Sequence, residues 1–204
     1  MTIPVWPQRF DKRLLFVVCL IPLTFILYDT FTNQLGANPV EALSHRTGAW
    51  SLRFLWLTLA ITPLRKQFGL IRLVPLRRML GLYAFFYICL HLFVYLVLDR
   101  SLLWSEIEVD VTKRPYIFLG FAVFLMLIPL AATSNSRMIR RLGGQRWKKL
   151  HRLVYPAAIG ANIHFFWLVK SDIREPLLYS AILAVLFWYR LPSLFKKQPS
   201  PVPR

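Results

Sequence analysis

The side chains in this sequence that are best suited to hold a cofactor are its histidines. His91 ends the apolar stretch LGLYAFFYICLH, and the apolar segment Leu150–Lys170 carries both His151 and His164. On one helix these last two would lie ~20 Å apart, one near each face of a membrane. An imidazole in lipid is unfavourable without a partner, so it points to a functional site. The alternative is a histidine that packs on a neighbouring helix through a hydrogen bond.

Long apolar runs must position these histidines. The chain has 204 residues and is 56% hydrophobic, which is unusual for a soluble domain. Six runs are long enough, or nearly so, to cross a hydrocarbon core of ~30 Å. They are Leu14–Phe31, Ala49–Leu64, Met79–Leu98, Tyr116–Ala132, Leu150–Lys170 and Pro176–Tyr189. We therefore predict an all-α integral membrane protein, with a six-transmembrane-helix bundle forming a single membrane domain over residues 1–204.

The basic residues orient the six runs. Of the 26 Lys and Arg residues, 19 precede the first run, follow the sixth, or lie in the connections between the second and third and the fourth and fifth runs. An excess of Lys and Arg marks the cytoplasmic side, so both termini are predicted to be cytoplasmic. The net charge of +17 does not indicate nucleic-acid binding, because the basic residues alternate with apolar runs instead of covering a soluble face.

This topology places two histidines at the same depth. His91 lies seven residues before Leu98 at the outer end of the third run, and His164 lies six residues before Lys170 at the outer end of the fifth. Matched histidines on different helices suit axial ligation of one haem iron. The sequence has no CxxCH motif, so such a haem would be held without thioether links. We predict His91 and His164 as the axial ligands.

Small residues precede both histidines at helical spacing and would let a flat macrocycle lie close to the backbone. They are Gly81 and Ala84 before His91, and Ala157, Gly160 and Ala161 before His164. The alternative is that they serve close packing of membrane helices.

His151 lies at the cytoplasmic edge of the fifth run, where the third run offers Arg77 and Arg78 instead of a histidine. A second bis-histidine site is therefore not predicted. Three roles stay open for His151: a haem ligand with an unusual partner, a hydrogen-bond partner of a cofactor head group, or an ordinary interfacial histidine. His45 is predicted to be a surface or capping residue, with a role near the outer haem edge as the alternative.

Cationic and aromatic side chains are expected to gather near His151. They are Arg77, Arg78, Arg140, Arg141, Arg146, Trp147, Lys148 and Lys149. Such a patch suits the phosphate of a flavin nucleotide or a quinone head group, and we assign Arg77, Arg78 and Trp147 to it. It equally suits anionic lipid head groups.

Two stretches resemble the haem-bearing segments of the ferric-reductase-like transmembrane proteins. They are Arg77–His91 (RRMLGLYAFFYICLH) and Leu142–His164 (LGGQRWKKLHRLVYPAAIGANIH), and the outer stretch Ala37–Trp50 (ANPVEALSHRTGAW) also fits. Within this group the chain is similar to the membrane subunits of bacterial periplasmic methionine sulfoxide reductase systems. The resemblance covers most of the chain, with residues 49–170 as the haem-binding core.

The resemblance implies a b-type cytochrome of the inner membrane that carries heme b and also FMN. Electrons would come from the quinone pool, or from a cytoplasmic flavin reductase. They would pass to a periplasmic molybdopterin-containing methionine sulfoxide reductase subunit in a heterodimer. The chain would then be the electron-transfer subunit and not the catalytic one. Haem ligation carries over to His91, His164 and His151, although relatives with two haems have two histidines on each of two helices.

Two other functions stay open. A stand-alone ferric reductase shares the predicted haem site, but the chain shows no flavin-binding or NAD(P)H-binding motif of its own. A transporter or structural subunit would use the histidines as proton relays, yet no clear pair of broken helices is present. The outer loop Asp99–Arg114, with Glu106, Glu108 and Asp110, is predicted to dock the partner. Its alternative is a solvated acidic loop.

Overall fold

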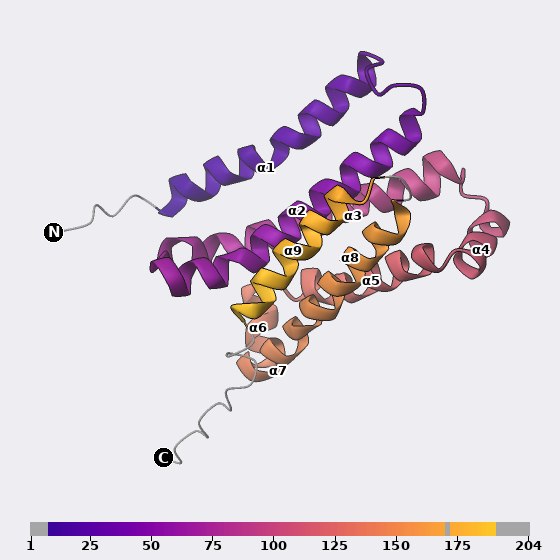
Figure 1. The fold of residues 1–204 in the computed structure, drawn as a ribbon. Helices are drawn as coiled ribbons and strands as arrows, with labels where there is room; N and C mark the ends of the chain where they lie inside the picture. The colour runs from indigo at the N-terminus through magenta and orange to yellow at the C-terminus, as the bar shows by residue number, and fades with distance from the viewer. Residues whose placement is uncertain (1–7, 170–171, 191–204) are drawn as a thin grey trace, which may run out of the picture.

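The computed structural model describes residues 8–169 and 172–190, and every regular element within them is helical (Figure 1). The α-helices are α1 (Gln8–Phe31), α2 (Pro39–Phe68), α3 (Arg77–Phe93), α4 (Trp104–Lys113), α5 (Pro115–Ala132), α6 (Ser136–Leu142), α7 (Gly144–Leu150), α8 (Val154–Leu168) and α9 (Arg174–Trp188). The 3₁₀ helix η1 (Ile71–Leu76) leads into α3, the π-helical η2 (Val94–Asp99) extends it, and the 3₁₀ turn η3 (His151–Leu153) joins α7 to α8. The prediction of an all-α fold is confirmed.

Within the described residues, three helical segments are long and apolar enough to cross a membrane. They are Lys12–Phe31, Ile71–Asp99 and Pro115–Ala132. The predicted runs in α2, α8 and α9 are also helical, but α8 and α9 have only 15 residues each. Lys170, the predicted end of the fifth run, lies outside the described residues.

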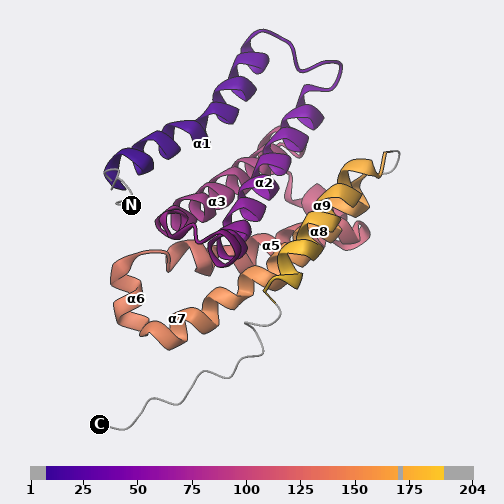
Figure 2. The same cartoon turned by 60° about the vertical axis from the view of Figure 1, so that its left-hand side comes forward.

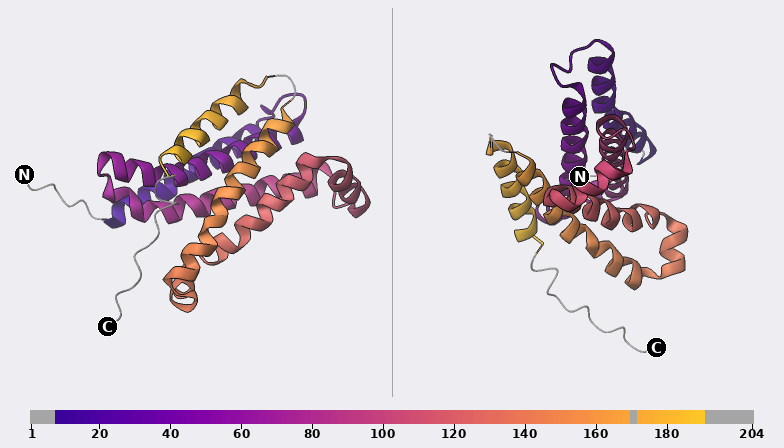
Figure 3. Two further views of the ribbon diagram at one scale, coloured as in Figure 1. Left: turned by 60° about the horizontal axis from the view of Figure 1, so that its bottom comes forward. Right: turned by 90° about the vertical axis from the view of Figure 1, so that its right-hand side faces the viewer.

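Two helix pairs form the centre of the molecule. Helix α2 packs along α3, and α5 packs along α8. The two pairs run at an angle to each other, as the left view of Figure 3 shows. Helix α9 packs against α2 and α8, while α1 contacts α2 and α3 and lies on the opposite side from α6 and α7 (Figure 2). Helix α4 lies at one end of the α5–α8 pair and the α6–α7 hairpin at the other (Figure 1). We call these the α4 end and the α6–α7 end.

Buried tyrosines fasten α1 to this core. Tyr87 is fully buried, stacks on Phe54 with ring centres 5.3 Å apart, and donates its hydroxyl hydrogen bond to the Cys19 carbonyl over 3.0 Å. One turn earlier, Tyr83 donates to the Phe16 carbonyl over 2.9 Å. In apolar surroundings a hydroxyl needs such a partner, so these bonds fix how α1 lies on α3.

The helix that carries His151 and His164 is not uniform. The backbone leaves the α-helical pattern at His151–Leu153 and resumes it at Val154. Pro156 follows shortly after, and it has no N–H to donate to the carbonyl four residues earlier, at Arg152. The 3₁₀ turn separates the His151 segment from α8, so the ideal-helix relation between the two histidines does not hold.

Candidate functional site

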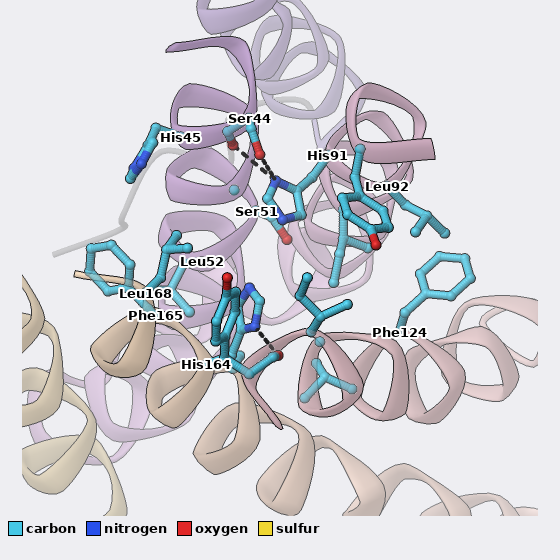
Figure 4. Close-up of a pocket in the computed structure, with 18 of the residues that line it drawn as sticks. Ser44, His45, Ser51, Leu52, His91, Leu92, Phe124, His164, Phe165 and Leu168 are labelled. Atoms are coloured by element: carbon cyan, nitrogen blue, oxygen red, sulfur yellow. Dashed lines mark hydrogen bonds between the residues drawn. The ribbon is translucent and has the colours of Figure 1, made fainter. Parts of the chain in front are cut away.

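The imidazole rings of His91 and His164 meet between the two helix pairs. His91 extends from α3 and His164 from α8, and their ring centres lie 6.2 Å apart with an interplanar angle of 82° (Figure 4). The structure therefore brings together the two histidines that the sequence analysis paired.

Both rings are oriented by a backbone carbonyl of a neighbouring helix. The Nδ1–H group of His91 donates to the carbonyl of Ser44 on α2 over 2.9 Å, and that of His164 donates to the carbonyl of Tyr116 on α5 over 2.7 Å. A carbonyl can only accept, so Nδ1 must carry the proton and Nε2 the lone pair. Figure 4 shows the second nitrogen of each ring on the side that faces the other histidine. Metal-bound histidines are commonly held in this way.

A glycine lies against each ring. A Cβ on Gly120 would be 2.9 Å from Cε1 and 3.1 Å from Nδ1 of His164, and a Cβ on Gly48 would be 3.1 Å from Nδ1 of His91. Any larger residue at Gly120 would displace the ring beside it. These glycines were not singled out from the sequence, because only the packing of α2 on α3 and of α5 on α8 brings them to the histidines.

The two rings project into a cavity of about 400 Å³ that is bounded by α2, α3, α5 and α8. Its wall is mainly apolar and includes Leu52, Leu55, Ile88, Leu92, Phe121, Phe124 and Phe165. The volume falls in the range of cofactor pockets, and a few polar groups in an apolar wall are typical of them.

Charged side chains line the cavity at the α4 end. Arg100 and Arg114 both contribute to the wall, and both bind the buried carboxylate of Asp110 through Nε, over 2.6 Å and 3.2 Å. Tyr95 donates its hydroxyl to the same carboxylate over 3.1 Å. Burial alone would lower the pKa of the Arg100 guanidinium, but Asp99 and Asp110 raise it above its ordinary value. This cluster ties α4 to the ends of η2 and α5.

These features fit a haem. Two imidazole nitrogens that bind one metal from opposite sides, each at about 2 Å, leave ring centres about 6 Å apart, close to the separation of His91 and His164. No group of three or more His, Cys, Asp or Glu side chains that could hold a metal occurs in the described part of the chain. Two protein ligands are what an iron needs when a porphyrin supplies the others, and the apolar wall suits the macrocycle.

His151 is not part of this cavity. Its Nε2 lies 3.1 Å from Oγ1 of Thr133, and its ring packs against Trp147 with centres 4.0 Å apart and an interplanar angle of 31°. The Thr133 hydroxyl already donates to the carbonyl of Pro129 over 2.6 Å, so His151 must donate through Nε2 and keep its lone pair on Nδ1. Trp147 donates to the Thr133 carbonyl over 3.0 Å.

The predicted patch is only partly assembled around His151. His151 and Trp147 are in contact at the α6–α7 end, and the positive charge of Arg77, which is exposed at the start of α3, acts on His151. Arg78 is exposed at the start of α3. The basic residues of α6 and α7 are exposed as well; they are Arg137, Arg140, Arg141, Arg146, Lys148 and Lys149.

The other predicted outer residues take different positions. His45 lies at the edge of the cavity, 3.9 Å from the carboxylate of Glu41 and largely exposed. In the predicted docking loop, Asp110 is buried and Glu106 pairs with Arg100 over 3.8 Å, while Glu108 is exposed.

Most of the small residues serve helix packing. Of the five small residues predicted to lie beside a macrocycle, Ala161 lines the cavity. A Cβ on Gly160 would meet Val123 of α5 at 2.7 Å, and one on Gly81 would meet Thr58 of α2 at 3.6 Å. Ala157 is fully buried. Close helix approach, the alternative reading of these positions, therefore describes them better than contact with a macrocycle.

Comparison with known proteins gives consistent matches. The family model described as ferric reductase like transmembrane component matches residues 47–161. The chain is 49% identical over 185 residues to the protein-methionine-sulfoxide reductase heme-binding subunit MsrQ of Xanthomonas oryzae pv. oryzae (strain MAFF 311018), covering 88% of this chain and 84% of the relative. It is 45% identical over 193 residues to the MsrQ of Rhodospirillum rubrum, covering 95% and 93%. No solved structure matches.

Proposed function

Because the chain belongs to the MsrQ family, within the ferric-reductase-like transmembrane proteins, we propose that it is the haem-binding, electron-transferring membrane subunit of a protein-methionine-sulfoxide reductase. The observation that carries this proposal is the pair of facing imidazoles, His91 and His164, 6.2 Å apart in an apolar cavity. Its relatives are named as heme-binding subunits, and these two side chains are the ones that fit such a group.

A b-type haem, when bound, supplies one-electron transfer between two oxidation states of its iron. His91 and His164 would bind that iron through Nε2, because their Nδ1 atoms are committed to the carbonyls of Ser44 and Tyr116. If His91 and His164 both bound the iron, they would keep small molecules off the metal. The site is therefore suited to pass electrons on and not to perform chemistry on a substrate.

The chain would cross the bacterial inner membrane six times. The three long apolar segments are complemented by α2, α8 and α9, which pack into the same bundle. The excess of basic residues would place both termini and the α6–α7 end in the cytoplasm. The α4 end of the cavity would then face the periplasm.

Electrons would enter from the cytoplasmic side and leave at the periplasmic side. The donor would be the quinone pool or a cytoplasmic flavin reductase. The acceptor would be a periplasmic molybdopterin-containing methionine sulfoxide reductase subunit, bound as a heterodimer, and the outcome would be repair of oxidised periplasmic proteins. The loop 99–114 is proposed as its docking surface.

A second cofactor position is proposed at the α6–α7 end. His151 and Trp147 are in contact there, and the positive charge of Arg77 acts on His151, which supports contact with FMN, a quinone head group or a further haem. A ligand role for His151 would use Nδ1, or would require its Nε2 to leave Thr133.

Electron delivery to a defined acceptor tests the proposal. The purified, haem-loaded protein is reduced, and the reduced haem absorption band is followed after addition of the catalytic subunit with methionine sulfoxide. We expect rapid loss of the band only when both are present. His45→Ala is the matched control for the variants His91→Ala and His164→Ala, since His45 lies at the cavity edge without facing the ring pair.

Three results would contradict the proposal. The first is a normal low-spin b-type spectrum in both His91→Ala and His164→Ala. The second is oxidation by chelated ferric iron that is faster than oxidation by the catalytic subunit, which would favour a stand-alone ferric reductase. The third is the absence of any pigment after haem-replete expression, which would favour a transporter or structural subunit.

A further inference from the structure

The two histidines are held by the same arrangement, repeated on two different helix pairs. Ser44 and Gly48 on α2 contact His91, and they are four residues apart. Tyr116 and Gly120 on α5 contact His164 and are also four residues apart. In each case the carbonyl of residue i accepts from Nδ1–H, and the glycine at i+4 lies against the ring.

The spacing of four has a physical reason. In an α-helix the carbonyl of residue i points toward the N–H of residue i+4, and the Cα–Cβ bond of residue i+4 tilts back toward the helix N-terminus. A side chain at i+4 therefore covers the carbonyl of residue i, and a glycine leaves it open to a second donor. The measured approaches agree, since a Cβ on Gly120 would be 3.1 Å from the very Nδ1 atom that donates to Tyr116, and one on Gly48 would be 3.1 Å from Nδ1 of His91.

We propose that Gly48 and Gly120 are positioning residues that uncover the Ser44 and Tyr116 carbonyls and thereby lock the two axial imidazoles in a nearly perpendicular arrangement. This inference rests on the proposed function, because it concerns how the chain would hold a haem. Each ring is fixed at one edge by its hydrogen bond and on one side by the glycine. The angle between the planes, 82°, is therefore set by the packing of the protein.

A perpendicular arrangement has a spectroscopic consequence. Each imidazole donates π electron density mainly into the iron d orbital that is perpendicular to its own ring plane. Two parallel rings donate into the same iron d orbital and so separate it in energy from the second d orbital of that kind. Two perpendicular rings donate into one of these d orbitals each and leave the two nearly equal in energy. Orbital angular momentum is then retained in the low-spin ferric ion, which makes its electron paramagnetic resonance (EPR) signal highly anisotropic.

The experiment is the low-temperature EPR spectrum of the oxidised, haem-loaded protein. We expect one resolved low-field feature in the wild type instead of three resolved features of a rhombic signal. In Gly120→Ala the ring of His164 must move, so we expect the wild-type feature to be lost and replaced by a rhombic or a high-spin signal. Gly48→Ala, with the milder contact, should shift the same feature. Gly81→Ala is the matched control, because its Cβ would meet only Thr58 at an ordinary 3.6 Å, and it should keep the wild-type signal.

Two results would overturn the inference and leave the proposed function intact. One is a rhombic wild-type signal together with a normal low-spin optical spectrum. The other is a signal that is unchanged in both Gly48→Ala and Gly120→Ala. If Gly120→Ala does not fold, the wild type and Gly48→Ala still decide the matter. A wild-type protein without low-spin haem would contradict the proposed function and this inference together.

Discussion

The carboxylate of Asp110 is the centre of the charged cluster at the α4 end of the cavity. Its side chain is 8% exposed, its two oxygens form ion pairs with Arg100 and Arg114, and one of them accepts a hydrogen bond from Tyr95. Asp110→Asn keeps the shape, removes the negative charge and turns one acceptor into a donor that faces a guanidinium. Losing one partner of a buried ion pair costs about 3–5 kcal/mol, and an exposed pair contributes about 1 kcal/mol or less.

The exposed fractions of the Arg100 and Arg114 side chains decide how much stability the substitution Asp110→Asn costs. The side chain of Arg100 is 20% exposed and that of Arg114 is 46% exposed, so the Arg100 pair dominates and the Arg114 pair adds little. We expect a loss of about 3 kcal/mol, which for a chain of this size lowers Tm by about 6–12 °C. Because Tyr95, Arg100 and Arg114 also line the cavity, haem retention should fall with it.

The assay is thermal unfolding of the purified, detergent-solubilised protein, followed by far-UV circular dichroism and by release of haem. Glu108→Gln is the matched control, since Glu108 is an exposed acidic residue on the same helix. We expect no measurable change in Tm for Glu108→Gln. The reasoning is refuted if Asp110→Asn lowers Tm no more than Glu108→Gln does.

Two further substitutions test the packing of α8 on α5 and the role of His151. Gly160→Ala would place a Cβ 2.7 Å from Val123 Cγ2, and overpacking of this kind costs about 1–3 kcal/mol; its Tm should fall relative to Gly81→Ala, and equal values would refute tight α5–α8 packing. His151→Ala should leave the low-spin spectrum of the cavity site intact, because His151 does not line that cavity; an absorption spectrum that has lost it would show that the two regions are coupled.

Much of the fold follows from hydrophobicity along the chain. All six apolar runs are helical over their described residues except at Val169 and Tyr189, because in lipid the backbone must satisfy its own hydrogen bonds. The short polar helices α4, α6 and α7 were not predicted. Helices of 7 to 10 residues are stabilised by contacts such as the Asp110 cluster and by caps such as Asn135, which accepts from the N–H of Met138 over 2.8 Å, and not by a long apolar pattern.

The ring pair was predictable and its support was not. His91 and His164 could be matched from their distances to the helix ends, since depth in a membrane follows from residue count. Gly48 and Gly120 meet the rings only through contacts between helices, which no local pattern specifies. The signal that could have indicated them is a glycine four residues after the helical residue whose carbonyl it leaves open, as in SHRTG (Ser44 to Gly48) and YIFLG (Tyr116 to Gly120).

His151 shows where local geometry departs from an ideal helix. The spacing of 13 residues to His164 gives a definite rotation on a regular helix, but the 3₁₀ turn at His151–Leu153 intervenes. The bond to Thr133 and the contact with Trp147 also depend on how α7 folds back on α5, which the sequence pattern does not contain.

The nature of the two axial ligands tests the central claim most directly. Near-infrared magnetic circular dichroism of the oxidised protein reports it, because the energy of the porphyrin-to-iron charge-transfer band depends on both ligands. The geometry of His91 and His164 predicts a band at the energy of bis-imidazole coordination in the wild type. A band at the energy of any other ligand pair, or of high-spin iron, would contradict the account.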